Sequence, residues 1–289
     1  MMKPEEPEGP VRLVKTPDEI KRIQSVYGRC HFIGTHNLTV SFETTPAAVR
    51  ALLPPPLQPT AEPLGLAWVG EAANSNCVGP LQGAALYIRA RYGDIVGNYC
   101  VTMPVSTPEA VTFGRELYGE PSKLAKIIFE QQDEYVWGSA ERHQIRFLSL
   151  RGRMTEAAPT GRLQTSTFQF KYLPRADGVG FDSPPQLVHV IGDMKIEAAK
   201  RGRGELIFRD SPHDPIADIP VRQVIEAVYT EGPLYTSGQV LCEVDPEEFL
   251  PYAFSRVDAF DVVEEGTFLH AQAARKSREG KGQWRTIKV

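Results

Sequence analysis

The stretch GRELYGEPSKL, residues 114–124, decides how this chain is interpreted. It follows Thr107-Pro108-Glu109, where a threonine N-cap, a proline in the first turn and an acidic residue are typical of a helix start. We therefore expect a helix that delivers the beginning of the stretch and an extended segment after Pro121. The stretch holds residue types that bind anions and transfer protons.

Three other helix starts carry similar signals, at Thr16-Pro17-Asp18-Glu19, Thr45-Pro46 and Asp245-Pro246. The second of these helices must end at the proline run of residues 54–56. Apolar residues at helical spacing behind Pro220 predict one further helix over residues 221–228.

Between these helices, hydrophobic and polar residues mostly alternate, with a period of two residues. Such alternation predicts half-buried antiparallel strands, and the rhythm of a parallel βαβ fold is absent. The sequence therefore predicts a strand-dominated α+β fold, built around a barrel or strongly bent sheets. The alternation is clear at residues 36–42, 86–91, 168–172 and 240–244.

Composition bounds the class of protein. The chain has 289 residues and 42% hydrophobic content, enough for a substantial core. A net charge of −4 gives no electrostatic reason to expect a nucleic-acid partner. No apolar run approaches the ~20 residues that span a bilayer. Four widely spaced cysteines favour reduced thiols in a cytoplasmic protein, and no histidine–carboxylate spacing indicates a metal.

The expected organisation is a single domain over residues 16–265 between two dissimilar ends. Residues 1–15 are acidic and proline-rich, which favours a disordered leader. Residues 266–289 are basic, and two interpretations stay open for them: a solvated tail, or an arm that contacts a neighbouring subunit.

Residues 114–124 resemble the active-site segment of the acetoacetate decarboxylase family, whose pattern reads roughly G-R-E-(three residues)-P-K-K-L. In that family the first of the paired lysines is the Schiff-base nucleophile. Here that position is Ser122, and the second lysine remains as Lys123. A hydroxyl cannot condense with a ketone to form an imine, so the resemblance implies the family's scaffold with altered chemistry.

The resemblance extends in order from about residue 30 to residue 245. It includes the segments at residues 48–57, 62–64, 97–99, 170–178 and 214–221. It implies one domain with a central β-barrel flanked by antiparallel strands and a few short helices, in a homo-oligomer that uses no cofactor. The family's pocket also holds an arginine and two glutamates. Matching segments place these at Thr35, Trp68 and Gln82 in this chain, which makes these positions and Ser122 candidate substrate contacts.

Three charged residues of the stretch are the candidate catalytic groups. Lys123 would hold a carboxylate or polarise a carbonyl, become the imine former itself, or be an ordinary surface lysine. Glu116 would donate a proton if an apolar setting raised its pKa, or else form an ion pair with Arg115. Arg115 would bind a substrate carboxylate or brace the turn. Ser122 could instead be a small neutral residue that only fills space, and Trp68 could instead be a residue of the hydrophobic core.

These observations lead to one functional hypothesis and two alternatives. The expected activity is cofactor-independent decarboxylation of a β-keto or polyunsaturated, polyketide-like carboxylic acid, in which the substrate itself accepts the electron pair. The first alternative is Schiff-base aldol, dehydration or cyclisation chemistry on Lys123. The second is a non-catalytic homologue that binds a small apolar acid.

Overall fold

The computed structural model describes residues 11–257, and within them the strands form one 14-stranded sheet. The α-helices are α1 (Pro17–Gly28), α2 (Pro46–Leu52), α3 (Pro108–Leu117) and α4 (Pro246–Phe249), with short 3₁₀ helices η1 (Ile216–Asp218) and η2 (Leu250–Arg256). The strands are β1 (Cys30–Glu43), β2 (Gln58–Pro59), β3 (Leu64–Ser75), β4 (Leu81–Tyr92), β5 (Ile95–Val105), β6 (Ser122–Leu124), β7 (Lys126–Gln132), β8 (Tyr135–Arg142), β9 (Ile145–Ala157), β10 (Gly161–Lys171), β11 (Gln186–Ile196), β12 (Ala198–Phe208), β13 (Gln223–Glu231) and β14 (Leu234–Glu243).

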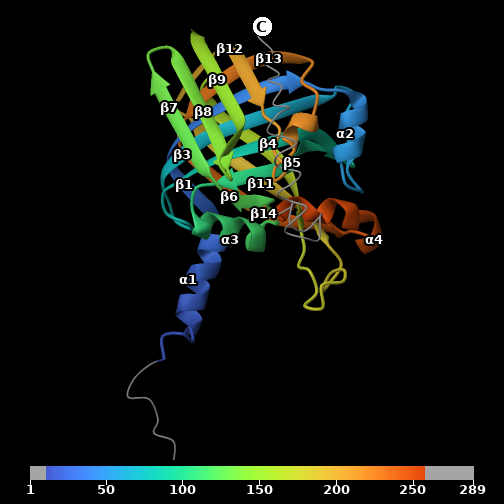
Figure 1. Cartoon of the computed structure of the whole chain (residues 1–289). Coiled ribbons are helices and arrows are strands. Elements are labelled where there is room, and N and C mark those ends of the chain that lie inside the picture. Colours follow the sequence, from blue (N-terminus) through green and yellow to red (C-terminus); the bar gives the residue numbers. More distant parts are fainter. Residues whose placement is uncertain (1–10, 258–289) are drawn as a thin grey trace, which may run out of the picture.

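Part of this sheet closes on itself. The order β14-β11-β10-β5-β4-β3-β1 returns to its start because β1 also pairs with β14. The first residues of β1, Cys30–Phe32, pair with β14, whereas the later residues His36–Glu43 pair with β13. The result is a barrel-like ring of strands, from which the rest of the sheet continues as a flap (Figure 1).

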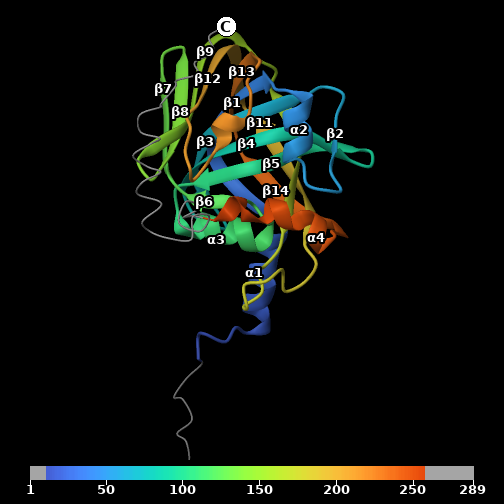
Figure 2. The same ribbon diagram turned by 45° about the vertical axis from the view of Figure 1, so that its right-hand side comes forward.

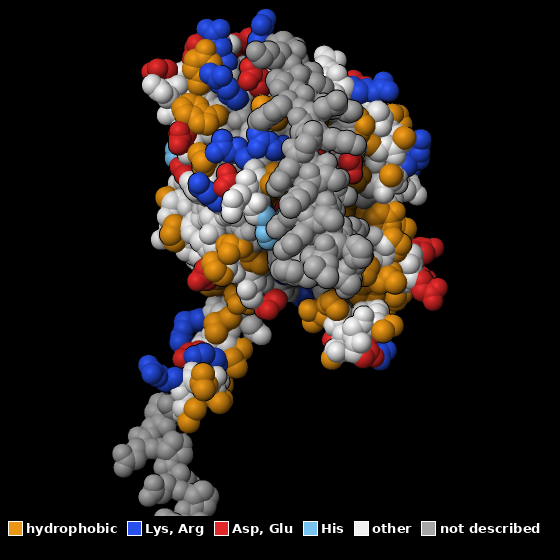
Figure 3. All heavy atoms as spheres, viewed as in Figure 1, with side chains coloured by type: hydrophobic (Ala, Val, Ile, Leu, Met, Phe, Trp, Pro, Cys, Tyr) orange, Lys and Arg blue, Asp and Glu red, His pale blue; other side chains and the backbone are white. Residues whose placement is uncertain are grey.

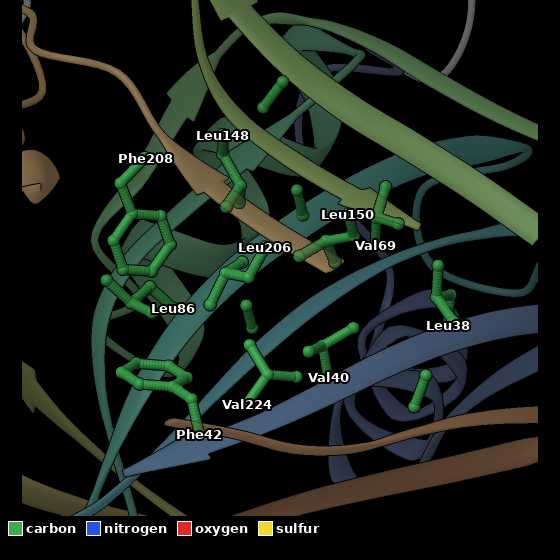
Figure 4. Packing of buried hydrophobic residues seen from close by; sticks show 14 of the residues in the cluster. Leu38, Val40, Phe42, Val69, Leu86, Leu148, Leu150, Leu206, Phe208 and Val224 are labelled. Carbon is green, nitrogen blue, oxygen red and sulfur yellow. The ribbon is translucent and has the colours of Figure 1, made fainter. Parts of the chain in front are cut away.

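The flap, β13-β12-β9-β8-β7, covers one outer side of the ring, and the main core lies between the two layers (Figure 4). Successive side chains of a strand point to opposite faces, so each strand of the ring has one face toward the inside of the ring and one face toward its outside. On β1 the residues Leu38, Val40 and Phe42 face this core. Threonine and asparagine residues between them face the inside of the ring. Further core residues labelled in Figure 4 are Val69, Leu86, Leu148, Leu150, Leu206, Phe208 and Val224.

The helices begin where the capping signals predict. Thr16, Thr45 and Thr107 each accept a hydrogen bond from a first-turn amide, and Thr16 forms a full capping box with Glu19. Figure 2 shows α3 and α4 at the same end of the molecule. At this end η2 lies close enough to contact the turn that follows α3.

Helix α1 projects from the body and has no buried residue (Figure 3). Its apolar side chains Ile20, Ile23 and Tyr27 are all more than two-fifths exposed. Among residues 11–257, no helix combines the length and apolar character that crossing a membrane requires.

The strand-dominated α+β prediction is confirmed, with a barrel-like ring that closes where β1 pairs with β14, as are the four capped helix starts. The helix predicted over residues 221–228 is wrong, because this region forms the turn into β13 and β13 itself. β13 pairs with β1 on one side and β12 on the other, and these long-range hydrogen bonds override local spacing. The ends of the chain, residues 1–10 and 258–289, lie outside the described residues, so the leader and the basic tail stay predictions.

Candidate active site

The ring encloses a cavity of ≈480 Å³, lined by β1, β3, β4, β5, β10, β11, β13 and β14 with α3 and its following turn. Its wall is largely apolar, with Phe32, Leu66, Trp68, Phe113 and Met194 among its larger side chains. A cavity of this size lies in the range of about 300–1,000 Å³ that holds small-molecule ligands.

The turn after α3 delivers a carboxyl group to this cavity. Gly119 adopts a left-handed conformation with φ of 80°, which reverses the chain directly after the helix. The next residue, Glu120, donates its backbone amide to the Gly114 carbonyl at 3.0 Å. A Cβ atom at Gly114 would lie 2.2 Å from Glu120 Oε2, so a larger residue there would displace the carboxyl group. Glu120 lines the cavity.

Burial raises the pKa of Glu120 to about 7, while a hydrogen bond from Ser122 acts in the opposite direction. The Ser122 hydroxyl donates to Oε2 at 3.3 Å. Some surface of Glu120 remains accessible through the cavity, but its carboxyl group is enclosed by protein. The nearby phenols Tyr87 and Tyr118 line the same cavity, and burial raises the pKa of both. Near neutral pH, Glu120 can therefore exchange a proton with a bound ligand.

None of the described residues that line the cavity is a lysine, arginine or histidine. The other polar groups of the lining are neutral hydroxyls and amides, except Glu71 on β3. Glu71 pairs across the sheet with His36, on the core-facing side of β1, and accepts a hydrogen bond from Gln82 at 3.2 Å. The lining therefore favours an uncharged ligand over a free carboxylate.

Ser122 and Lys123 point to opposite sides of β6. β6 runs parallel to β5, and Ser122 lies opposite Met103, which lines the cavity, whereas Lys123 lies opposite Pro104. Ser122 itself, a predicted substrate contact, is fully buried and is not part of the cavity lining. Lys123 is 4% exposed and its Nζ donates to the His213 carbonyl at 3.0 Å and to Asp214 Oδ1 at 3.1 Å. Lys123 is therefore part of a buried ion cluster outside the cavity lining.

The same cluster contains Arg142, whose Nη1 lies 2.8 Å from Asp214 Oδ2. The ring of His213 stacks on His143 with centroids 3.8 Å apart. Buried charges need compensating partners, and this cluster supplies them at the junction of β6, β8 and the segment before η1. The geometry is that of a structural ion pair.

Arg115 braces the turn that carries Glu120. Its Nε donates to the Ser122 carbonyl at 2.6 Å and its guanidinium donates to the Arg256 carbonyl at 3.1 Å. Arg256 in turn donates to the carbonyls of Gly119 and Phe170, at 2.7 and 2.5 Å. Arg115 does not line the cavity, so its position does not fit the predicted contact with a substrate carboxylate. Its hydrogen bonds fit the alternative, in which it braces the turn.

The expectation that Glu116 faces an apolar pocket needs correction. Glu116 lies in the last turn of α3, is exposed, and does not line the cavity. A helix turns by about 100° per residue, so Glu116 and the turn residues after it point in different directions. The carboxyl group that faces the cavity is Glu120.

Two of the three positions matched to the family's other pocket residues line the cavity. Thr35 is buried and donates to the Gly232 carbonyl, and Trp68 donates from Nε1 to Asn37 Oδ1 at 3.0 Å. Gln82 does not line the cavity, because it alternates with Gly83 and Leu81, which do. The structure therefore brings Thr35 and Trp68 together with Glu120, and leaves Gln82 on the opposite face of β4.

Sequence reasoning missed Glu120 and Gln169, both of which line the cavity. Glu120 lies two residues before Ser122, and strand-like alternation would have placed the two on one side. Gln169 alternates with Phe168 and Phe170 on β10, and this alternation predicts a half-buried strand with its polar face away from the core. Ring closure encloses this face, which no local signal shows.

Comparisons with a family profile, with related sequences and with solved structures identify the family of this chain. The sequence profile of the acetoacetate decarboxylase (ADC) family matches residues 17–243. The acetoacetate decarboxylase of Burkholderia cenocepacia is 27% identical over 206 residues, which cover 69% of this chain and 82% of the relative. The chain belongs to the acetoacetate decarboxylase family and is a decarboxylase-like enzyme.

Solved structures share the fold at lower identity. The acetoacetate decarboxylase of Legionella pneumophila matches with a TM-score of 0.67 and 21% identity, over 75% of this chain and 88% of that one. The enduracididine biosynthesis enzyme MppR, in complex with the condensation product of pyruvate and imidazole 4-carboxaldehyde, matches with a TM-score of 0.67 and 15% identity, over 75% and 90%. At such identities the similarity establishes the architecture alone.

Proposed function

We propose that this protein is a cofactor-independent decarboxylase of a β-keto or polyunsaturated, polyketide-like carboxylic acid, and that it works without a Schiff base. One observation carries the proposal: the cavity lining includes the carboxyl of Glu120, with a pKa raised to about 7, and no described lysine shares the lining. Glu120 replaces Glu116 as the proposed proton donor.

The proposed reaction begins with the acid form of the substrate. A cavity without cations raises the pKa of a bound carboxylic acid by the same desolvation that acts on Glu120. A neutral β-keto acid passes its own proton to the ketone oxygen while the bond to the carboxyl carbon breaks. Carbon dioxide leaves and the electron pair becomes the double bond of an enol. No amine is needed for this step.

Glu120 then converts the enol to the ketone. Its protonated carboxyl donates a proton to the carbon that lost carbon dioxide, and the resulting carboxylate receives the enol proton. For a polyunsaturated acid, Glu120 would protonate a remote carbon of the conjugated chain. The carboxyl proton of the substrate then returns to the Glu120 carboxylate as carbon dioxide leaves, and the electron pair of the broken bond completes the shifted double bond. The size and apolar character of the cavity support a substrate with a longer carbon chain than acetoacetate.

The decisive experiment measures carbon dioxide release from a panel of β-keto and polyenoic acids by wild type, Glu120→Gln and Lys123→Met. We expect Glu120→Gln to lower kcat by about 10²–10⁴, which is typical for loss of a general acid. Lys123→Met is expected to lower the free energy of unfolding by about 3 kcal/mol, because it breaks a buried ion pair, and to keep the turnover of the folded enzyme.

A second measurement addresses the Schiff base directly. Borohydride added to enzyme and a ketone product should leave the intact mass of the protein unchanged. A trapped adduct on Lys123, or loss of turnover in a folded Lys123→Met protein, would contradict the proposal. Binding of the acids without carbon dioxide release from any of them would support a non-catalytic homologue instead.

A further inference from the structure

Gln169 on β10 is a buried polar residue whose hydrogen bonding is incomplete. It is 2% exposed and lines the cavity. Its Nε2 donates to Thr167 Oγ1 at 3.1 Å, but its Oε1 is buried and has no hydrogen-bond partner among residues 11–257. A buried acceptor without a donor is costly, so such a group in a cavity wall points to a ligand.

The neighbouring hydroxyl bonds to the NH₂ end of the amide. Thr167 Oγ1 accepts from Gln169 Nε2 at 3.1 Å, and its own proton points to the Val190 carbonyl across a long contact of 3.5 Å. Only the NH₂ group can donate to it, which leaves Oε1 as the available atom. The wall thus offers a hydrogen-bond acceptor, and a ligand must bring the donor.

Gln169 lies next to the turn that carries Glu120. A Cβ atom at Gly119 would lie 2.5 Å from the backbone nitrogen of Lys171 and 2.6 Å from the carbonyl carbon of Phe170, so this turn packs directly on β10 beside Gln169. Arg256 joins the same two segments by donating to the carbonyls of Gly119 and Phe170. A ligand group held by Gln169 therefore lies at the Glu120 end of the cavity.

We propose that Gln169 Oε1 accepts a hydrogen bond from an O–H group of the ligand, and that the cavity thereby selects an uncharged, mainly apolar molecule with a hydroxyl group beside the reacting carbon. In the proposed reaction, which this inference takes as its basis, that group is the O–H of the enol. A carboxylate has no proton to give to Oε1, and no described cation in the lining would compensate its charge.

A phenol is a stable enol that cannot lose carbon dioxide, so phenols test this inference apart from catalysis. The probes are para-pentylphenol, para-pentylanisole and pentylbenzene, which share an apolar tail and differ in the O–H group. Binding is measured by titration calorimetry below pH 7, where Glu120, with its pKa of about 7, is protonated. We expect wild type to bind the phenol about tenfold more tightly than the other two, as one buried hydrogen bond allows.

The variant Gln169→Leu, similar in size, should bring this ratio to about one while thermal stability stays the same or rises, because a half-satisfied amide is removed. Gln164→Leu makes the same change at an exposed position of β10 and should keep the wild-type ratio. An equal preference for the phenol in Gln169→Leu, or no preference in wild type, would overturn the inference. If decarboxylation failed but the ratio depended on Gln169, the proposed function alone would fall.

Discussion

At the scale of single residues, the chemistry turns on which side chains of residues 114–124 face the cavity. Ser122 stands where relatives carry the imine-forming lysine, and its hydroxyl donates to Glu120. Lys123 points to the opposite side and contacts Asp214. In the proposed mechanism, an acid with a pKa of about 7 takes the place of an amine, and proton transfer replaces covalent capture.

The raised pKa of Glu120 makes a prediction about stability. The carboxyl has a pKa of about 7 in the folded state against 4.5 for a solvated glutamate, so between these pH values the folded protein binds more protons than the unfolded chain. The free energy of unfolding should therefore fall as pH rises through this window. Glu120→Gln removes this contribution and should flatten the fall, measured as the thermal midpoint across the window.

The matched control for this titration is Glu116→Gln, the same change at an exposed carboxyl. We expect it to keep the wild-type slope, because its side chain contacts solvent in the folded protein as it does in the unfolded chain. An identical slope for wild type and Glu120→Gln would show that Glu120 does not titrate in this range.

At the scale of elements, the turn between α3 and β6 places Glu120 in the wall of the cavity. Gly119 supplies the left-handed conformation, and two arginines bind the carbonyls on either side of Glu120. Each contact uses backbone atoms, so the position of Glu120 depends on the path of the chain more than on neighbouring side chains.

Gly119→Ala should therefore damage both stability and catalysis. The added Cβ would meet backbone atoms of β10 at 2.5 and 2.6 Å, and φ of 80° is itself unfavourable for alanine. The control is Gly93→Ala in the β4–β5 turn, where φ is 55° but a Cβ would meet nothing within 4 Å. Both should lose about 1 kcal/mol from conformation, and Gly119→Ala should lose more and also show lower kcat. Equal losses in the two variants would contradict tight packing of this turn on β10.

At the scale of the whole molecule, one sheet forms both the main hydrophobic core and the cavity. The ring is sealed where β1 pairs with β14, and the flap covers the outside of the ring with the main apolar core. Helix α1 has no buried residue and presents apolar side chains on its surface. We propose that this helix is an arm that packs against another copy of the chain in a homo-oligomer.

The double substitution Ile20→Glu and Ile23→Glu tests the arm. It removes no buried contact, so the fold should persist by circular dichroism, while the mass measured by light scattering after size exclusion should fall. Ser25→Glu, on the polar side of α1, should keep the wild-type mass. An unchanged mass in the double variant, or a monomeric wild type, would reject this role for α1.

Much of the architecture was accessible from sequence because its signals are local. Capping residues such as Thr16, Thr45 and Thr107 act within one turn of helix, and alternation along β1, β4 and β10 needs only neighbouring residues. The helix predicted over residues 221–228 failed for the converse reason. Its apolar spacing was compatible with a helix, but pairing with β1 and β12 made it a strand.

By itself, the sequence determined the family and the strand-dominated fold, and it predicts the loss of an amine at Ser122, since each depends on residue identity at short range. Only the tertiary structure decided which groups share the cavity. Closing the ring enclosed a strand face that reads as exposed, which buried Gln169, and desolvation there gave Glu120 its raised pKa. Side-chain direction and desolvation arise from contacts between distant segments, and no local pattern encodes them.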